Sequence, residues 1–280
     1  MVGFFYFYTL LIPFQEVGLT VCAVAYFNIN KNEMDIRQYL DSTYLKTASQ
    51  AGLSEQENTK IVEGYVQEAI DEKFKLIMIR PDKVALAKKM IASAKSKVDV
   101  GTVIDFPEGQ SSTIEKLEEA IQALLDGADE LDFVCNYKAF KKGLINEVKE
   151  EILKCTQLGL EHHKTVKWII EVAALNNHQI IQLCVLIKNV VMSNFKEESY
   201  PSVFVKSSTG FYKTKNKLPN GATLPSLIMM LENVSPLPVK ASGGIKTYQE
   251  AIEMIQLGVK RIGTSGAKTI ANGLVSENDY

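Results

Sequence analysis

Cysteine and histidine are scarce in this 280-residue chain, and neither occurs in a ligand-like arrangement. The four cysteines are far apart, with no C-x-x-C pair, at Cys22, Cys135, Cys155 and Cys184. This spacing predicts neither a zinc site nor a disulfide framework. Of the three histidines, His162 and His163 follow Glu161 in a polar stretch that is typical of solvated surface. We therefore expect no metal, and a reduced, cytoplasmic protein.

The chain also lacks an excess of one charge. It carries 31 Lys and Arg against 33 Asp and Glu, a net charge of −2, and the two signs are mixed along the sequence. A nucleic-acid partner requires a clustered basic face, so none is expected. No linker or low-complexity segment follows residue 34, and 46% hydrophobic residues can supply one large core. Residues 34–280 are predicted to form one catalytic domain that ends in a tail.

The first 33 residues differ from the rest of the chain. They are apolar and aromatic, with no Lys or Arg before Lys31, so the basic start of a secretory signal is missing. A spanning helix needs about 20 apolar residues, and Pro13, Gln15 and Glu16 interrupt this stretch. Three interpretations stay open: the product of an upstream start codon, an anchor or organelle-targeting segment, or a folded extension. Unless the segment is an anchor, we expect no stable membrane association.

From Asp35 onward, short apolar runs alternate with amphipathic stretches. Most of the runs are continuous Val, Ile, Leu and Phe rather than alternating, as expected of parallel strands that are covered on both faces. The candidate strands are Ile36–Leu40, Leu76–Ile79, Val98–Ile104, Glu130–Cys135, Trp168–Ala173, Val203–Ser207, Pro238–Ala241 and Arg261–Thr264.

Capping boxes predict the starts of three helices between these strands. They pair Ser54 with Glu57, Ser112 with Glu115, and Thr247 with Glu250. After the second box, Gly127 ends a helix whose apolar face is expected to comprise Ile114, Leu117, Ile121, Leu124 and Leu125. Eight β-α units in about 240 residues fit a single (β/α)8 barrel. An open, doubly wound sheet is the alternative, but no G-x-G-x-x-G follows the first strand.

Two lysines end apolar strand-like runs, and a glycine-containing turn follows each of them. Lys206 precedes Ser207–Gly210, and Lys240 precedes Ala241–Gly244. Burial disfavours the ammonium form of lysine, and a second cation nearby lowers its pKa further. A neutral amine is then available as a nucleophile. Two such lysines on neighbouring strands suggest amines presented to one pocket, which is what a Schiff-base enzyme needs.

Polar residues at strand ends form the candidate site, because catalytic groups of such barrels come from the C-terminal ends of the strands. Most of them interrupt apolar surroundings, where an ionised group is unfavourable without a partner. Any one of them could serve a salt bridge inside the barrel, but the convergence of lysines and carboxylates at one rim favours catalysis. The candidates are Asp41, Thr43, Asp105, Asp132, Asn136, Glu171, Lys206, Thr209, Lys240 and Ser265.

Glycine-rich turns indicate a phosphate site. Gly243 and Gly244 follow the seventh strand, and Gly263-Thr264-Ser265-Gly266 lies at the eighth. Backbone N–H groups after these two strands, with a helix N-terminus behind them, form the usual phosphate site of such barrels. Glycine lets the backbone approach the anion closely. We therefore expect a small phosphorylated substrate.

From about Tyr39 to the C-terminus, the sequence resembles the deoxyribose-phosphate aldolases, a family of class I aldolases. The motifs stand in the family's order and make a chance resemblance improbable. They are Leu40–Lys46 (LDSTYLK), Val103–Gly109 (VIDFPEG), Gly127–Asp132 (GADELD), Phe204–Gly210 (FVKSSTG) and Val239–Thr247 (VKASGGIKT).

The resemblance implies roles and a reaction without a cofactor. Lys206 forms the imine, Lys240 stays cationic and holds down the pKa of Lys206, and Asp132 moves protons. Tyr280 corresponds to a terminal tyrosine that assists proton transfer in the family, although a disordered tail is the simpler interpretation. The implied reaction is reversible cleavage of 2-deoxy-D-ribose 5-phosphate to glyceraldehyde 3-phosphate and acetaldehyde, in deoxyribose phosphate catabolism by a homodimer or homotetramer. Substrate and phosphate contacts are expected from Asp41, Thr43, Thr209, Gly210, Gly243, Gly244, Gly263 and Ser265.

Two positions depart from the family pattern. Met78 stands where members commonly have a cysteine, which predicts less covalent inactivation by aldehydes. Phe211 stands where a lysine often follows the glycine, so Lys213 either replaces its phosphate contact or belongs to a solvated basic loop, Lys213–Lys217. Two other functions are considered: another Schiff-base aldolase, and a barrel repurposed as a binding or scaffold protein. The presence of Asp132 and both lysines argues against the scaffold.

Overall fold

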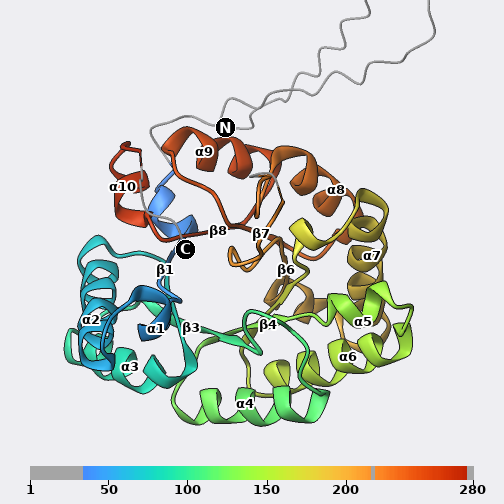
Figure 1. Ribbon diagram of the computed structural model, residues 1–280, viewed down its shortest axis with the longest axis horizontal. Helices are drawn as coiled ribbons and strands as arrows, with labels where there is room; N and C mark the ends of the chain where they lie inside the picture. Colours follow the sequence, from blue (N-terminus) through green and yellow to red (C-terminus); the bar gives the residue numbers. More distant parts are fainter. Residues whose placement is uncertain (1–33, 216–217, 276–280) are drawn as a thin grey trace, which may run out of the picture.

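Eight parallel strands close into a barrel in which each strand pairs with the next and the last pairs with the first. The computed structural model describes residues 34–215 and 218–275. Helices surround the strands in the view of Figure 1, so the predicted (β/α)8 barrel is confirmed. The strands are β1 Leu40–Thr43, β2 Leu76–Ile79, β3 Asp99–Ile104, β4 Glu130–Val134, β5 Thr165–Ile169, β6 Val203–Lys206, β7 Val239–Ser242 and β8 Arg261–Thr264.

The helices between the strands are longest after β1, β4 and β5. The α-helices are α1 Ala48–Ala51, α2 Glu55–Glu72, α3 Val84–Ser93, α4 Thr113–Leu125, α5 Tyr137–Lys141, α6 Ile145–Glu161, α7 Asn177–Asn194, α8 Leu224–Val234, α9 Tyr248–Leu257 and α10 Ala267–Ala271. Four 3-10 helices accompany them, η1 Ile36–Tyr39, η2 Pro81–Lys83, η3 Val172–Ala174 and η4 Glu197–Ser202. Within the two described ranges, no helix combines the length and apolar content needed to cross a bilayer.

Two strand predictions were misplaced. Residues 36–39 form η1 instead of a strand, because the Asp35 side chain accepts a hydrogen bond from the backbone N–H of Arg37 and starts a helical turn. The first strand therefore begins at Leu40. The fifth strand begins at Thr165 rather than Trp168, and its expected end forms η3. The prediction missed this start because Lys167 interrupts the apolar run.

The three predicted capping boxes are confirmed, but the predicted face of α4 is wrong. Each box shows its reciprocal hydrogen bonds, at the starts of α2, α4 and α9. The face of α4 that packs on the barrel carries Lys116, Ala120 and Ala123. In contrast, Ile114, Ile121 and Leu125 are exposed, with Leu117 and Leu124 at the edge of the core. The space between α4 and the barrel wall accommodates small residues there, so helical periodicity alone selected the wrong face.

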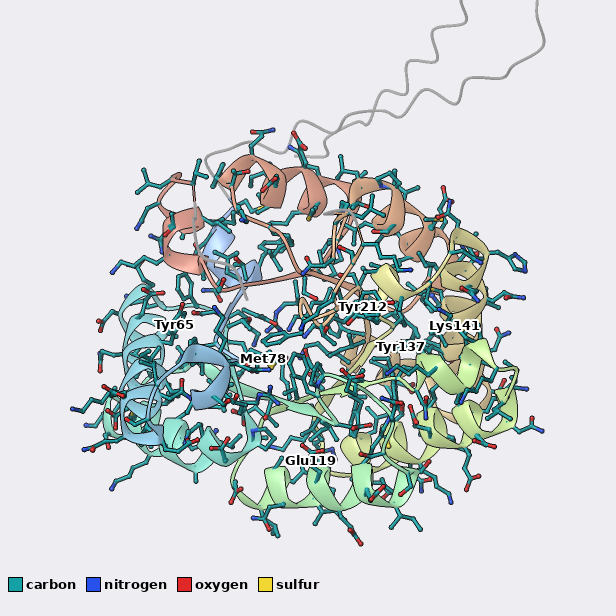
Figure 2. The ribbon with its side chains drawn as sticks, viewed as in Figure 1. Tyr65, Met78, Glu119, Tyr137, Lys141 and Tyr212 are labelled. Carbon is teal, nitrogen blue, oxygen red and sulfur yellow. The ribbon has the colours of Figure 1, made fainter. Side chains whose placement is uncertain are left out.

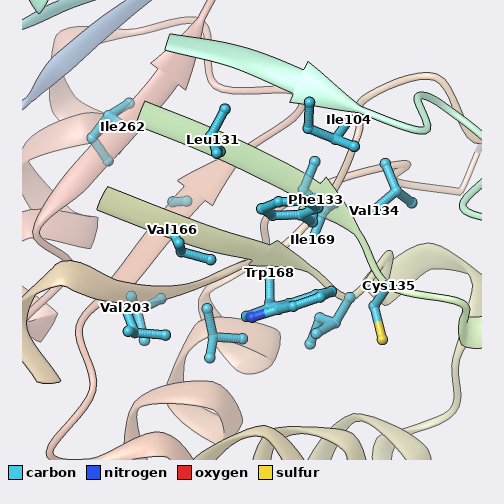
Figure 3. Packing of buried hydrophobic residues seen from close by; sticks show 14 of the residues in the cluster. Ile104, Leu131, Phe133, Val134, Cys135, Val166, Trp168, Ile169, Val203 and Ile262 are labelled. Atoms are coloured by element: carbon cyan, nitrogen blue, oxygen red, sulfur yellow. The ribbon is translucent and has the colours of Figure 1, made fainter. Parts of the chain in front are cut away.

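The core lies mainly between the barrel wall and the helices. Figure 3 shows this layer, where the rings of Phe133 and Trp168 stack with centroids 5.3 Å apart. The indole N–H of Trp168 donates to Thr156 Oγ1 at 2.9 Å, so the one polar atom of that ring is satisfied. Because side chains alternate along a strand, the residues between these apolar positions point into the barrel. There the sequence places charges instead of aliphatic residues.

Candidate active site

Lys206, Lys240 and Asp132 meet inside the barrel. Lys206 ends β6, Lys240 is its cross-strand partner in β7, and Asp132 lies in β4. One carboxylate oxygen of Asp132, Oδ2, is 3.0 Å from the Lys206 amine and 3.0 Å from the Lys240 amine. All three side chains are buried, and Lys206 is 3% exposed. The structure thus brings together the three residues that the sequence predicted as catalytic.

The ionisation of this cluster follows from its surroundings. Burial, and next the neighbouring Lys240 ammonium, lower the pKa of Lys206 to about 8, although Asp132 acts in the opposite direction. Burial would raise the pKa of Asp132, but the surrounding lysines, with Lys167 the largest contributor, hold it far below its usual range. A fraction of Lys206 is therefore a neutral amine near pH 7, beside a carboxylate that remains ionised.

Lys167 was not among the predicted site residues, although it contacts the same carboxylate. Its amine is 2.5 Å from Asp132 Oδ1 and 2.5 Å from Glu130 Oε2, and the side chain is fully buried. Burial would lower the pKa of Lys167, but the nearby carboxylates, Asp132 first among them, raise it above its ordinary value. The available signal was a lysine inside the apolar run Val166–Ile170, the same signal that identified Lys206.

Three further charged residues extend the cluster below the site. Asp41 is fully buried, and its Oδ2 is 2.6 Å from the Lys240 amine. Arg261 makes an ion pair with Asp41 Oδ1 and another, at 3.1 Å, with Glu130. Burial opposes ionisation of Asp41, but Arg261 and Lys240 keep its pKa below the ordinary value. We call these side chains the interior charge network: Asp41, Glu130, Asp132, Lys167, Lys206, Lys240 and Arg261.

Glu171 organises the turn that follows Lys206. It has a left-handed backbone, with φ at 55°, and 1% of the residue is exposed. Its Oε1 accepts a hydrogen bond from Ser208 Oγ at 2.6 Å, and its Oε2 accepts from both the backbone N–H and the hydroxyl of Thr209. Burial raises the pKa of Glu171, against the effect of the hydrogen bonds from Ser208 and Thr209. The hydroxyl of Thr209, a predicted substrate contact, is thus held by the protein.

The predicted glycine turns after β6 and β7 lie against each other. Gly210 and Gly243 have φ values of 81° and 85°, which side-chain-bearing residues rarely adopt. A Cβ on Gly243 would lie 3.5 Å from the Cα of Gly210. The long loop after Gly210 returns to the same place, where a Cβ on Gly221 would come within 2.4 Å of the Gly243 carbonyl oxygen. These approaches leave backbone rather than side chains at the rim, as an anion site requires.

The other residues predicted to contact substrate or phosphate differ in burial and in their position relative to the strand ends. Gly244 follows Gly243 with φ at 76° and is exposed. Ser265 follows β8 and is half-buried. Gly263 lies inside β8, where it pairs with Asp41, so it precedes the turn instead of forming it. Thr43 is buried, and its hydroxyl donates to the Asp41 carbonyl oxygen at 2.9 Å.

One wall of the barrel interior is apolar. Met78 lies in the middle of the barrel in the view of Figure 2 and is fully buried. A Cβ on Gly101 would lie 2.6 Å from the Met78 methyl group, so Gly101 provides the space for that side chain. Phe211, the residue that departs from the family pattern, meets Phe106 edge to face at 5.1 Å. The apolar cluster comprises Leu45, Leu76, Met78 and Val103, with Phe106 and Phe211 packed against it.

Two predicted strand-end residues serve loop structure. The carboxylate of Asp105 accepts hydrogen bonds from the backbone and hydroxyl of Ser111 and lies 3.4 Å from the Lys116 amine. Asn136 caps α5, and its backbone N–H donates to Glu151 at 3.0 Å. Glu151 in turn forms an ion pair with Lys116 at 3.0 Å. These residues support the loops beside the site.

Two further residues were singled out in the sequence, Lys213 and Tyr280. Lys213 is exposed, as a solvated loop residue would be. Tyr212 turns inward from the same loop and meets Tyr137 of α5 edge to face at 6.5 Å (Figure 2). Tyr280 and residues 1–33 lie outside the described residues. In the part of the chain that the structure describes, no three His, Cys, Asp or Glu residues group as a metal site would require.

Comparison with known proteins agrees with this geometry. Residues 41–276 match the model of the DeoC/LacD family of aldolases. A deoxyribose-phosphate aldolase of Thermococcus gammatolerans is 37% identical, over 86% of this chain and 96% of that protein. One of Thermococcus kodakarensis is 36% identical, over 88% of this chain and all of that protein. The tetrameric deoxyribose-phosphate aldolase of Aeropyrum pernix superposes with a TM-score of 0.66 at 26% identity, covering 84% of this chain and 88% of that one.

Proposed function

Because the chain belongs to the DeoC/LacD family of aldolases, we propose that it cleaves 2-deoxy-D-ribose 5-phosphate reversibly to D-glyceraldehyde 3-phosphate and acetaldehyde. One observation carries the proposal. A lysine with a pKa of about 8 lies 3.0 Å from a carboxylate that is ionised, inside a barrel whose neighbouring rim is formed by glycine backbone. This combination provides a nucleophilic amine, a proton carrier and an anion site within one barrel.

The chemistry starts at the neutral amine of Lys206. It attacks the aldehyde carbon of the open-chain sugar and forms a carbinolamine, which takes up a proton and loses water to give an iminium ion. Asp132 is in place to take the proton from the attacking nitrogen and to return it to the departing hydroxyl. The Lys240 amine contacts two carboxylates, Asp41 and Asp132.

The iminium ion then accepts the electrons of the bond that breaks. The C3 hydroxyl loses its proton, the C2–C3 bond cleaves, and glyceraldehyde 3-phosphate leaves. The electron pair of the broken bond forms an enamine on Lys206. Protonation of the enamine carbon and hydrolysis of the resulting iminium ion release acetaldehyde and restore the free amine. No oxidant, reductant or metal is required by this sequence of steps.

The phosphate of the substrate is assigned to the glycine rim. Gly210, Gly243 and Gly244 all have positive φ values, so this part of the rim carries backbone without side chains. Ser265 follows the next strand on the same face of the barrel. The apolar wall around Met78 lies on the strands β2 and β3, on another side of the barrel interior. This division orients the sugar with its charged end toward β7 and β8.

The test is direct product analysis. Purified protein is incubated with 2-deoxy-D-ribose 5-phosphate, and both acetaldehyde and glyceraldehyde 3-phosphate are quantified. We expect the two products in equal amounts, and none from Lys206→Met. The exposed Lys260→Met variant serves as the matched control and retains activity. A folded protein that forms neither product from this sugar would refute the assignment, and cleavage of a different phosphorylated sugar would redirect it within the aldolases.

A further inference from the structure

The interior charge network is closed. Asp41 and Glu130 each bridge two cations, Asp132 contacts three, and three of the cations each bridge two carboxylates. The successive ion pairs are Asp132–Lys167 (2.5 Å), Lys167–Glu130 (2.5 Å), Glu130–Arg261 (3.1 Å), Arg261–Asp41, Asp41–Lys240 (2.6 Å) and Lys240–Asp132 (3.0 Å). Lys206 is not part of this closed circuit of six residues, and it contacts the circuit through Asp132.

The charges of the circuit balance without Lys206. The three carboxylates offset the charges of two lysines and one arginine, so a protonated Lys206 leaves the buried network with one excess positive charge. Every member is at most 6% exposed, so solvent screens this excess poorly. Among the described residues, Lys206 has one carboxylate partner, whereas Lys167 and Lys240 each have two. Lys206 is therefore the lysine of the network with the fewest carboxylate partners.

We propose that Glu130 and Arg261, which pair with each other and not with Lys206, are positioning residues that set the protonation of Lys206 through this charge balance. Both lie at the first position of their strands, β4 and β8, below the level where Lys206 ends β6. Their importance for catalysis rests on the proposed function, whereas their effect on the Lys206 amine does not.

The charged groups around Lys206 are defined on each side. β1 contributes Asp41, β4 contributes Glu130 and Asp132, β5 contributes Lys167, β7 contributes Lys240 and β8 contributes Arg261. Glu171, after β5, also interacts electrostatically with Lys206 but gives its oxygens to Ser208 and Thr209. Neutralising one member of the Glu130–Arg261 pair therefore changes the net charge of the network by one unit, with a sign set by the member removed.

The experiment titrates the amine without any sugar. Protein is treated with formaldehyde and cyanoborohydride between pH 6.5 and 10, and methylation of Lys206 is followed by peptide mass spectrometry, with the exposed Lys260 as internal reference. We expect Glu130→Gln to lower the midpoint of Lys206 methylation by about one pH unit or more, and Arg261→Gln to raise it by a similar amount. The double variant restores neutrality and returns the midpoint to near the wild-type value.

Two controls separate charge from structural damage. Arg261→Lys keeps the charge and is expected to leave the midpoint in place even where it lowers stability. Glu151→Gln removes another buried carboxylate that pairs with a lysine, Lys116, outside the network, and is also expected to leave it in place.

Shifts of the same sign in the two single variants, or no shift in either, would overturn the proposal. If Arg261→Gln does not fold, the comparison of Glu130→Gln with the double variant decides. A midpoint that moves as expected in a protein that cleaves no deoxyribose phosphate would leave this inference standing and remove the proposed function.

Discussion

Lys116 and Lys206 are both buried lysines, but they have different electrostatic surroundings. Lys116, on α4, is fully buried outside the barrel wall and has two carboxylates to itself, Glu151 at 3.0 Å and Asp105 at 3.4 Å. Its amine also donates to the carbonyl oxygen of Val134 at 2.7 Å. Lys206 shares its one carboxylate, Asp132, with two other lysines.

The comparison shows that burial alone does not make a lysine a nucleophile. A buried ammonium with carboxylates and carbonyl oxygens around it is compensated, and its role is to hold loops in place. A buried ammonium among other cations is unfavourable, and it releases its proton near neutral pH. The ratio of cations to carboxylates around the amine therefore separates Lys206, the proposed nucleophile, from Lys116.

The largest expected effect is that of Lys206→Met, which should reduce cleavage of deoxyribose phosphate by at least about 10³-fold. The same substitution should stabilise the fold. The pKa of Lys206 is about 8 in the folded protein and about 10.4 in an unfolded chain. Between these two pH values the unfolded state binds more protons than the folded state, so the free energy of unfolding rises with pH. Below about pH 8, Lys206 is protonated in both states and its full unfavourable contribution to stability is present. At pH 7 the free energy of unfolding should rise by about 1–3 kcal/mol.

Chemical denaturation at pH 7 and at pH 10 measures this stability difference. The gain should be smaller at pH 10, where Lys206 is neutral in the folded wild type. A variant that is less stable than the wild type at pH 7 would show that the ammonium of Lys206 is compensated after all.

Lys116→Met should have the opposite effect. It leaves Asp105 and Glu151 buried without their shared cation, so the free energy of unfolding is expected to fall by about 3–5 kcal/mol. The pH midpoint of Lys206 should not move, because Lys116 does not contact the interior charge network. Denaturation and amine titration on the same sample check both statements, and a moved midpoint would mean that the two lysine networks are coupled.

Lys240→Met sharpens the comparison by removing a cation beside Lys206. The pKa of Lys206 should then rise above 8, so a smaller fraction is neutral at pH 7 and the pH-rate profile of kcat/KM moves to higher pH. A rise of one unit reduces cleavage at pH 7 by about tenfold, and the loss should be recovered in part at pH 9. A loss that is equal at all pH values would instead assign Lys240 a direct chemical role.

Glu171→Gln should have the smallest effect, and it concerns the glycine rim. The glutamine amide has one acceptor oxygen, whereas the carboxylate of Glu171 uses two oxygens to accept hydrogen bonds from Ser208 and Thr209. The amide therefore cannot accept all of these hydrogen bonds. We expect KM for 2-deoxy-D-ribose 5-phosphate to rise by about three- to tenfold, with little change for unphosphorylated 2-deoxy-D-ribose. Equal increases for both sugars would place the effect of Glu171 at the amine instead of the phosphate.

The fold could largely be predicted from the sequence, because most of the strands are buried on both faces and read as apolar runs. Both misplaced strands have local causes. Asp35 starts a 3-10 turn where Ile36 suggested a strand, and Lys167 interrupts the run that begins at Thr165. The predicted face of α4 was wrong for a tertiary reason, since the barrel wall accommodates Ala120 and Ala123 and leaves Ile121 exposed.

The candidate site could be predicted in part. Lys206, Lys240 and Asp132 were recognisable because each is a charge within or at the end of a strand that otherwise has no charge beyond its first residue. Glu130 and Arg261 were not, because a charge at the first residue of a strand resembles an ordinary solvated start. Their pairing depends on how the strands stagger around the closed barrel, which brings residues 131 positions apart into contact. The sequence carries no local signal of that stagger.

Borohydride trapping with 2-deoxy-D-ribose 5-phosphate, followed by peptide mass spectrometry, is the direct test of Lys206 as the nucleophile. Within residues 34–215 and 218–275, four buried lysines compete in this experiment: Lys116, Lys167, Lys206 and Lys240. We expect one reduced adduct, on Lys206, which is lost in Lys206→Met. An adduct on Lys240 or Lys167, or no adduct on the folded protein, would contradict this expectation. The nucleophile would then not be Lys206, the lysine whose positive charge the buried carboxylates do not balance.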